Sequence, residues 1–146
     1  MLKRKMLVAM MFCLIGTSTY AKDGSQHCFW ANEILKVVDG DTIDVRVRLH
    51  PFSLLKDLRI RMEGINAWES RTRDLEEKKL GLAAKERLTE LVGDGSELLV
   101  CLSRQGKFGR WLGTLYVEGT NINTQLIAEG HAHEYLGGKR KEFNEN

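Results

Sequence analysis

Hydrophobic and polar residues alternate along several short stretches of the chain, as they do in strands with one buried face. The strictest alternation runs over 42–49 and follows a short β-branched stretch over 34–38. Asp39, Gly40 and Asp41 lie between the two stretches, where aspartate and glycine are typical of a turn. The pattern therefore predicts two strands joined by a tight turn.

A third alternating stretch lies over 58–63, after a loop marked by Pro51. It places Arg59 and Arg61 on one face, where either side chain would serve equally well as an ordinary surface cation. Two further strands are predicted over 97–102 and 111–117. The polar, basic stretch between them, over 103–110, is predicted to be a loop. The residues before the first strand, over 22–32, are interpreted as a lead-in strand or a tail.

Two stretches, 78–92 and 121–129, have the spacing of amphipathic helices, and each is followed by a glycine. The residues expected to face the core are Leu80, Ala84, Leu88, Leu91, Ile122 and Leu126. The charge-dense stretch over 69–77 has no apolar period and is interpreted as a solvated loop. From 137 onward the chain is polar and basic, and we expect it to fray.

This order of short strands and helices predicts an α+β fold that is mainly β. The architecture with this strand count is the five-stranded oligonucleotide-binding barrel (OB-fold), here with two or three flanking helices. A length of 146 residues with 42% hydrophobic residues suits one compact domain and excludes a disordered, collagen-like or multidomain chain.

The N-terminal residues have the pattern of a secretory signal peptide. Three basic residues at 3–5 precede an apolar stretch over 6–15, and small residues follow up to Ala21. The alternative is a short membrane anchor, although the apolar stretch is too short to span a bilayer. We expect cleavage after Ala21, a single domain over 22–146, and a secreted or periplasmic protein without membrane attachment.

Removing that leader changes the charge balance and the interpretation of the cysteines. The chain has 22 Lys+Arg and 20 Asp+Glu, and losing the three leader cations leaves 19 against 20, a net charge of −1. Attraction to a polyanion must then come from a local basic cluster. Because an oxidising compartment favours pairing, Cys28 and Cys101 are expected to form a disulfide, with two buried free thiols as the alternative.

Several polar residues suggest phosphate and metal chemistry, although Asp-Gly-Asp alone is most often just a turn. Arg61 is followed by Asn66 and Glu69, and Arg110 closes the basic loop. Two guanidinium groups suit phosphate oxygens, and the oxygens of Asp41 and Asn66 suit calcium or magnesium better than zinc. With a carboxylate to accept a proton from water, these are the components of metal-assisted phosphodiester hydrolysis.

Four motifs together resemble the staphylococcal nuclease (thermonuclease) family over about 33–136 of this chain. They are Val38-Asp-Gly-Asp-Thr42, Arg61-x-x-x-x-Asn-Ala-x-Glu69, Lys107-Phe-Gly-Arg110 and Ile122-Asn-x-x-Leu-Ile-x-Glu-Gly130. The resemblance implies an oligonucleotide-binding barrel and a calcium-dependent nuclease that cuts DNA and RNA to products with 3′-phosphate ends. The family's long last helix is absent here or is replaced by the basic tail. Lys139, Arg140 and Lys141 of this tail are most often solvated, but they could add electrostatic contact to a nucleic-acid backbone.

The resemblance also implies roles for individual residues. Asp41 and the backbone carbonyl of Ala67 would bind calcium, Arg61 and Arg110 would hold the scissile phosphate, and Glu69 would orient or deprotonate the attacking water. Asn66 stands where the best-known members have a charged metal ligand, which predicts weaker calcium binding or the use of another divalent metal.

Three side chains near these motifs are candidates for nucleic-acid binding. Trp68 replaces the family's usual proline and would either stack on a base or cover the barrel mouth. Lys107 and Phe108 precede Arg110, where Phe108 would touch a base or else belong to the core or rim. His131 and His133 have a spacing that zinc sometimes uses, but no third ligand is suggested nearby, so packing is the default interpretation.

The sequence therefore predicts a secreted, monomeric, calcium-dependent nuclease of low sequence selectivity that acts on single-stranded or frayed DNA and RNA. The first alternative is an oligonucleotide-binding module that has lost catalysis through Asn66. A disulfide-stabilised interaction domain is the second alternative, but it gives no reason for Asp41, Arg61, Glu69 and Arg110 to occur together.

Overall fold

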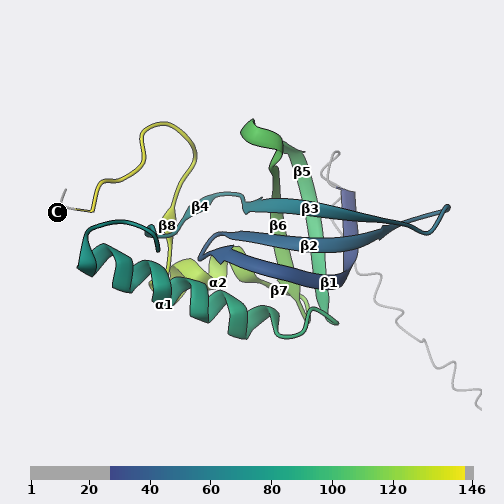
Figure 1. The fold of residues 1–146 in the computed structure, drawn as a ribbon, viewed down its shortest axis with the longest axis horizontal. Helices are drawn as coiled ribbons and strands as arrows, with labels where there is room; N and C mark the ends of the chain where they lie inside the picture. Colours follow the sequence, from purple (N-terminus) through teal and green to yellow (C-terminus); the bar gives the residue numbers. More distant parts are fainter. Residues whose placement is uncertain (1–26, 144–146) are drawn as a thin grey trace, which may run out of the picture.

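A computed structural model describes residues 27–143, which form a closed β-barrel with two helices packed against it (Figure 1). The predicted oligonucleotide-binding barrel is confirmed. The predicted signal peptide over 1–21 lies outside the described residues. Within 27–143 there is no helix with the length and hydrophobicity required to cross a membrane.

Five strands make the barrel: β1 (His27–Asp39), β2 (Thr42–Leu49), β3 (Leu54–Met62), β5 (Leu98–Gln105) and β6 (Trp111–Val117). They are paired in the order β3-β2-β1-β5-β6, and a parallel pairing between β3 and β6 closes the barrel. The helices are α1 (Leu75–Val92) and α2 (Ile122–Ala128), and a short 3-10 turn, η1, covers Lys107–Gly109. The remaining short strands are β4 (Ile65–Asn66), β7 (Thr120–Asn121) and β8 (His133–Glu134).

The alternation that predicted the second strand correctly identifies the barrel interior. Ile43, Val45 and Val47 of β2 are fully buried, whereas Arg48, the residue after them, faces solvent. Both helices add apolar side chains to the same core, among them Leu88 of α1. The predicted lead-in stretch over 22–32 is part of β1 from His27 onward. The first residues of β1 pair with β5, and the residues from Ala31 onward pair with β2.

Helix α1 begins at Leu75, three residues before the predicted start, and the predicted loop is correspondingly shorter. Asp74 caps the helix by accepting hydrogen bonds from the backbone N–H groups of Glu76 and Glu77, each 3.0 Å long. Leu80, expected in the core, is 44% exposed, and its neighbour Gly81 is buried instead, against the backbone of residues 68–70. The buried face of α1 therefore includes fewer of the leucines than their spacing predicted.

The predicted disulfide is present and joins β1 to β5. Cys28 and Cys101 are direct register partners, 73 residues apart in the chain. Replacing both cysteines by alanine is expected to lower the free energy of unfolding by about 2–4 kcal/mol, because the unfolded chain gains conformational freedom. Urea unfolding of the oxidised protein and the double variant measures this difference, and equal unfolding midpoints would contradict it.

Candidate functional site

A buried ion pair lies at one end of the barrel, where the turn between β1 and β2 meets the end of β3. Arg61 Nη1 lies 2.7 Å from Asp41 Oδ2, and each residue is only 7% exposed. Strand register brings them together, since Arg61 is the partner of Thr42 in the β2–β3 pairing. Arg59, two residues earlier, is exposed and pairs with Asp44 on the barrel surface. The structure thus distinguishes two arginines that the sequence pattern treated alike.

The Asp41 carboxylate is fixed by two further hydrogen bonds. Thr42 Oγ1 donates to Oδ1 at 2.9 Å, and the backbone N–H of Ala67 donates to Oδ2 at 2.8 Å. A carboxylate has about four acceptor positions. With Arg61, three donors therefore leave one position of Asp41 for another ligand.

Asn66 contacts the same arginine. Arg61 Nη2 donates to Asn66 Oδ1 at 2.8 Å, so the amide oxygen predicted as a metal ligand binds a guanidinium in this structure. Asn66 Nδ2 lies 3.4 Å from His133 Nε2, because β4 pairs with β8. Burial lowers the pKa of His133, which suits a neutral ring packed against Trp68.

Positive charge accumulates around Arg61. Burial lowers the pKa of Arg61, the negative charge of Asp41 opposes that shift, and the cations Arg140 and Arg110 add to it. Glu69 also lies near enough to stabilise the charged guanidinium. Three arginines therefore act on one another at this end of the barrel, and an anion bound among them would relieve their repulsion.

Two glycines allow α1 to pack closely against the site. A Cβ on Gly81 would lie 2.6 Å from backbone atoms of Trp68, Glu69 and Ser70. A Cβ on Gly40 would lie 2.5 Å from the Ala84 side chain of the same helix. Only glycine fits at such contacts, so the helix fixes the position of the segment that carries Glu69.

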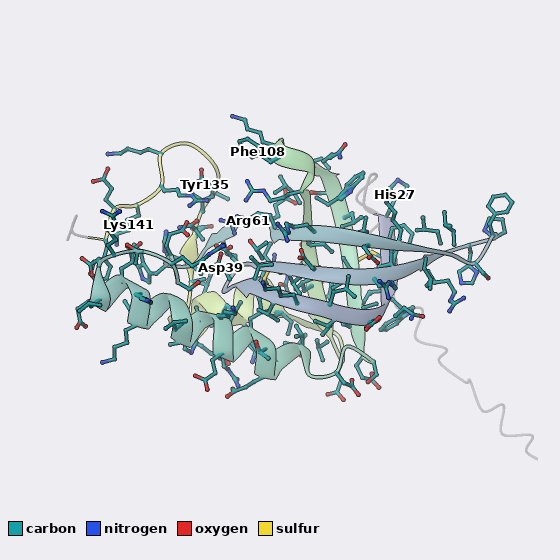
Figure 2. All side chains as sticks on the ribbon, viewed as in Figure 1. His27, Asp39, Arg61, Phe108, Tyr135 and Lys141 are labelled. Atoms are coloured by element: carbon teal, nitrogen blue, oxygen red, sulfur yellow. A yellow bond between two sulfur atoms is a disulfide. The ribbon has the colours of Figure 1, made fainter. Side chains whose placement is uncertain are left out.

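All of the predicted catalytic and metal-binding residues except Asn66 line one cavity of about 140 Å³. Its walls are formed by Asp39, Asp41, Thr42, Arg61, Ala67, Trp68, Glu69, Arg71, Arg110 and Arg140. Figure 2 places Asp39 and Arg61 at this end of the barrel, between α1 and the C-terminal segment. The cavity brings Asp41, Glu69 and both predicted phosphate-binding arginines together, although Arg110 is 69 positions from Asp41 in the sequence.

Lys107 and Phe108 lie in η1, just before Arg110, and neither residue lines the cavity. Phe108 is 90% exposed, so it belongs to neither the core nor a packed rim, and its backbone adopts a left-handed φ of 60°. The Arg110 guanidinium lies 5.8 Å from the centre of its ring. Trp68 instead packs between His133 and Phe143, with ring centroids 5.0 and 5.2 Å away, which favours its role as a cover at the barrel mouth.

Two residues at the site were not among the predicted catalytic or metal-binding residues. Asp39 accepts a hydrogen bond from Ser70 and pairs with Arg71 at 2.9 Å, which joins the first turn to the segment after Glu69. Arg140 lies in the stretch expected to fray, yet its Nη1 is 2.5 Å from Glu69 Oε1. The only sequence signal for Arg140 was the basic cluster at 139–141 in a chain of near-neutral charge.

The oxygen donors at the site suit a hard divalent cation. Asp39, Asp41 and Thr42 supply carboxylate and hydroxyl oxygens to the cavity, and Asp41 retains an acceptor position. Among residues 27–143, no three histidine, cysteine, aspartate or glutamate side chains form a metal-binding group by themselves. A cation held here would therefore also need backbone oxygens, such as that of Ala67, and water.

Comparison with known proteins identifies similar nucleases. The model of the staphylococcal nuclease homologue family matches residues 59–146, which is more than half of the chain. Micrococcal nuclease of Shigella flexneri is 31% identical over 118 residues, covering 73% of this chain and 60% of that protein. Protein ParB of Escherichia coli is 30% identical over 118 residues, covering 73% of this chain and 59% of that protein.

A plant protein is similar over a shorter region. Probable staphylococcal-like nuclease CAN1 of Oryza sativa subsp. japonica is 34% identical over 82 residues, which is 56% of this chain and 23% of that protein. This chain spans about three fifths of the length of the two bacterial relatives that it matches.

Proposed function

Because the chain belongs to the staphylococcal nuclease family, we propose that it hydrolyses phosphodiester bonds of DNA and RNA with little sequence selectivity. The observation that carries this proposal is the single cavity that Asp41, Arg61, Glu69 and Arg110 line together. Arginine forks and a solvent-accessible carboxylate around one small polar space are what the transition state of phosphoryl transfer requires. A barrel with a purely structural role would not require these four side chains to line the same cavity.

Arg61 and Arg110 hold the scissile phosphate in this proposal. Arg61 is buried and oriented by Asp41 and Asn66, so it presents a fixed guanidinium to the cavity. Arg110 is half-buried, and among residues 27–143 no carboxylate forms an ion pair with it. Both cations therefore stabilise the charge that accumulates on the phosphate oxygens in the transition state.

Glu69 acts on the attacking water. Its carboxylate is exposed to solvent and borders the cavity that the two arginines line. It accepts a hydrogen bond from that water and either orients it or takes its proton as it attacks phosphorus. When the bond to the 5′ oxygen breaks, the phosphate remains on the 3′ side of the cut.

We propose calcium as the cofactor, held by Asp41 and the backbone carbonyl of Ala67, with Asn66 as a further oxygen donor. When bound, calcium supplies Lewis-acid stabilisation of the phosphate oxygens. A neutral amide in place of a carboxylate weakens binding of a divalent cation. Because Asn66 also serves Arg61, we expect millimolar rather than micromolar calcium to be needed, or another divalent metal to replace it.

The setting of the reaction is part of the same proposal. A signal peptide over 1–21 would direct the protein to the periplasm or outside the cell, where it acts as a monomer. Phosphate contacts dominate binding, with Lys107, Phe108 and Trp68 beside them, so we expect single-stranded or frayed substrates and a steep loss of affinity with salt.

Metal-dependent cleavage tests the proposal. Purified protein is incubated with plasmid DNA and with RNA, with calcium or with chelator, and the product ends are identified. We expect degradation in calcium, none in chelator, and a loss of about 10²–10⁴-fold in rate for Glu69→Gln, which keeps the shape of the side chain.

A second outcome would favour a different function. The pairing of Asp41, Asp39 and Glu69 with arginines is also what a binding module without catalysis would show. Binding of both nucleic acids without cleavage in calcium, magnesium or manganese would contradict the nuclease and leave that module.

A further inference from the structure

The C-terminal segment, residues 135–143, brings a third arginine to the site. Figure 1 shows this segment leaving β8 and arching beside the end of the barrel that carries β4. In Figure 2, Tyr135 and Lys141 lie on the same side of the molecule as Asp39 and Arg61. Arg140, between them in the chain, borders the cavity with Arg61 and Arg110.

Contacts at both ends hold this segment in place. The backbone N–H of Tyr135 donates to the carbonyl of Gly64 at 2.9 Å, and its hydroxyl donates to the carbonyl of Gly138 at 2.8 Å. Gly137 and Gly138 have φ values of 104° and 94°, which other residues rarely adopt. They turn the chain back toward the site, and farther along Phe143 packs edge-on against Trp68.

The Arg140 guanidinium lies where a phosphate could exchange with its present partner. Its Nη1 is 2.5 Å from Glu69 Oε1, and the two side chains are 49% and 48% exposed. An ion pair that exposed contributes little stability, because water competes for both groups. The Arg61–Asp41 pair, by contrast, is buried. Arg61 is therefore held in place, whereas Arg140 can exchange its carboxylate partner for a phosphate.

Arg140 borders a second cavity in addition to the one that it shares with Glu69. Arg61, Arg110 and Arg140 also line an adjoining space of about 300 Å³ that reaches Tyr135 and Arg104. The three arginines therefore stand at the boundary between the two cavities. Burial lowers the pKa of Arg61, and repulsion from Arg140 and Arg110 adds to that shift. A phosphate at this boundary would contact all three arginines and would relieve the repulsion.

We propose that Arg140 is a third phosphate-binding residue, which pairs with Glu69 in the free protein and transfers to the substrate phosphate when nucleic acid binds. This rests on the proposed function, since the phosphate it takes is that of the nuclease substrate. The exchange has a consequence for Glu69. As Arg140 moves to the phosphate, the carboxylate becomes available to the attacking water.

Binding in the absence of cleavage tests this assignment. A fluorescent single-stranded oligonucleotide is titrated with Arg140→Ala and with the unmodified protein in chelator, at several salt concentrations. We expect Arg140→Ala to bind about tenfold more weakly at low salt. The slope of the logarithm of the binding constant against the logarithm of the salt concentration should become shallower by about 0.7, because one phosphate contact is lost. Arg140→Lys, which keeps the charge but not the fork, should lie between the two.

Arg48→Ala is the matched control, because it removes an equal charge from an exposed position of β2, outside both cavities. It should bind and cleave like the unmodified protein. In calcium, kcat/KM of Arg140→Ala should fall about tenfold or more.

Two results would overturn the proposal. If Arg140→Ala binds with unchanged affinity and salt dependence, the residue does not contact phosphate. If its cleavage rate rises, Arg140 only blocks Glu69. Failure of the unmodified protein to cleave would count against the nuclease alone, because the titration in chelator still measures the role of Arg140.

Discussion

Replacing Arg61 by alanine is expected to cause the largest combined loss of activity and stability. Removing the guanidinium leaves Asp41 buried with an uncompensated charge, and breaking such a pair costs about 3–5 kcal/mol of unfolding free energy. The variant also lacks a donor to the phosphate, so we expect kcat/KM to fall by about 10³-fold or more. Urea unfolding and cleavage of a single-stranded oligonucleotide in calcium measure the two effects.

Arg59→Ala is the matched control, because Arg59 lies on the same strand but is exposed and paired with Asp44. We expect it to change stability by less than about 1 kcal/mol and to leave cleavage unchanged. Equal losses for the two variants would show that Arg61 is an ordinary strand cation.

Arg110→Ala should separate activity from stability. Arg110 is half-buried and lies over the exposed Phe108 ring, and within 27–143 no carboxylate depends on it for neutralisation. We expect kcat/KM to fall by about 10²–10³-fold, because a transition-state donor is lost. The urea midpoint should hardly change, since no buried charge is exposed by the substitution.

Arg110→Lys tests whether the fork or only the charge matters. A lysine keeps one positive charge but cannot grip two phosphate oxygens at once, so most of the activity should still be lost. Full activity in Arg110→Lys would contradict bidentate binding. Loss of folding in Arg110→Ala would mean that the residue supports the structure.

The barrel was largely predictable because its strands follow local rules. The alternation over 42–49 identified the buried face of β2 correctly, and the aspartate-glycine turn was placed correctly before it. Gly81 could not be foreseen as a buried residue, because its burial depends on the backbone of Trp68, which lies outside the helix. A leucine pattern says which residues are apolar, but it does not say which neighbour the helix must approach.

The site was predictable in part, through the family resemblance and the spacing of its motifs. Asp41, Arg61, Glu69 and Arg110 line one cavity, whereas the role of each residue stays a prediction. Arg140 was not predictable as a site residue, because its place depends on the β4–β8 pairing and on two glycines with left-handed backbones. Short strands of this kind have no periodicity to detect, and a basic tail looks the same whether solvated or docked.

The central claim is that distant side chains act together on one phosphodiester bond, and a double-mutant cycle tests it most directly. The kcat/KM for a single-stranded oligonucleotide in calcium is measured for the unmodified protein, Glu69→Gln, Arg110→Ala and the double variant. Groups that act on the same transition state give strongly non-additive losses. We expect the double variant to be at most about tenfold slower than the slower single variant. Losses that simply multiply, or an unmodified protein that does not cleave, would contradict the account.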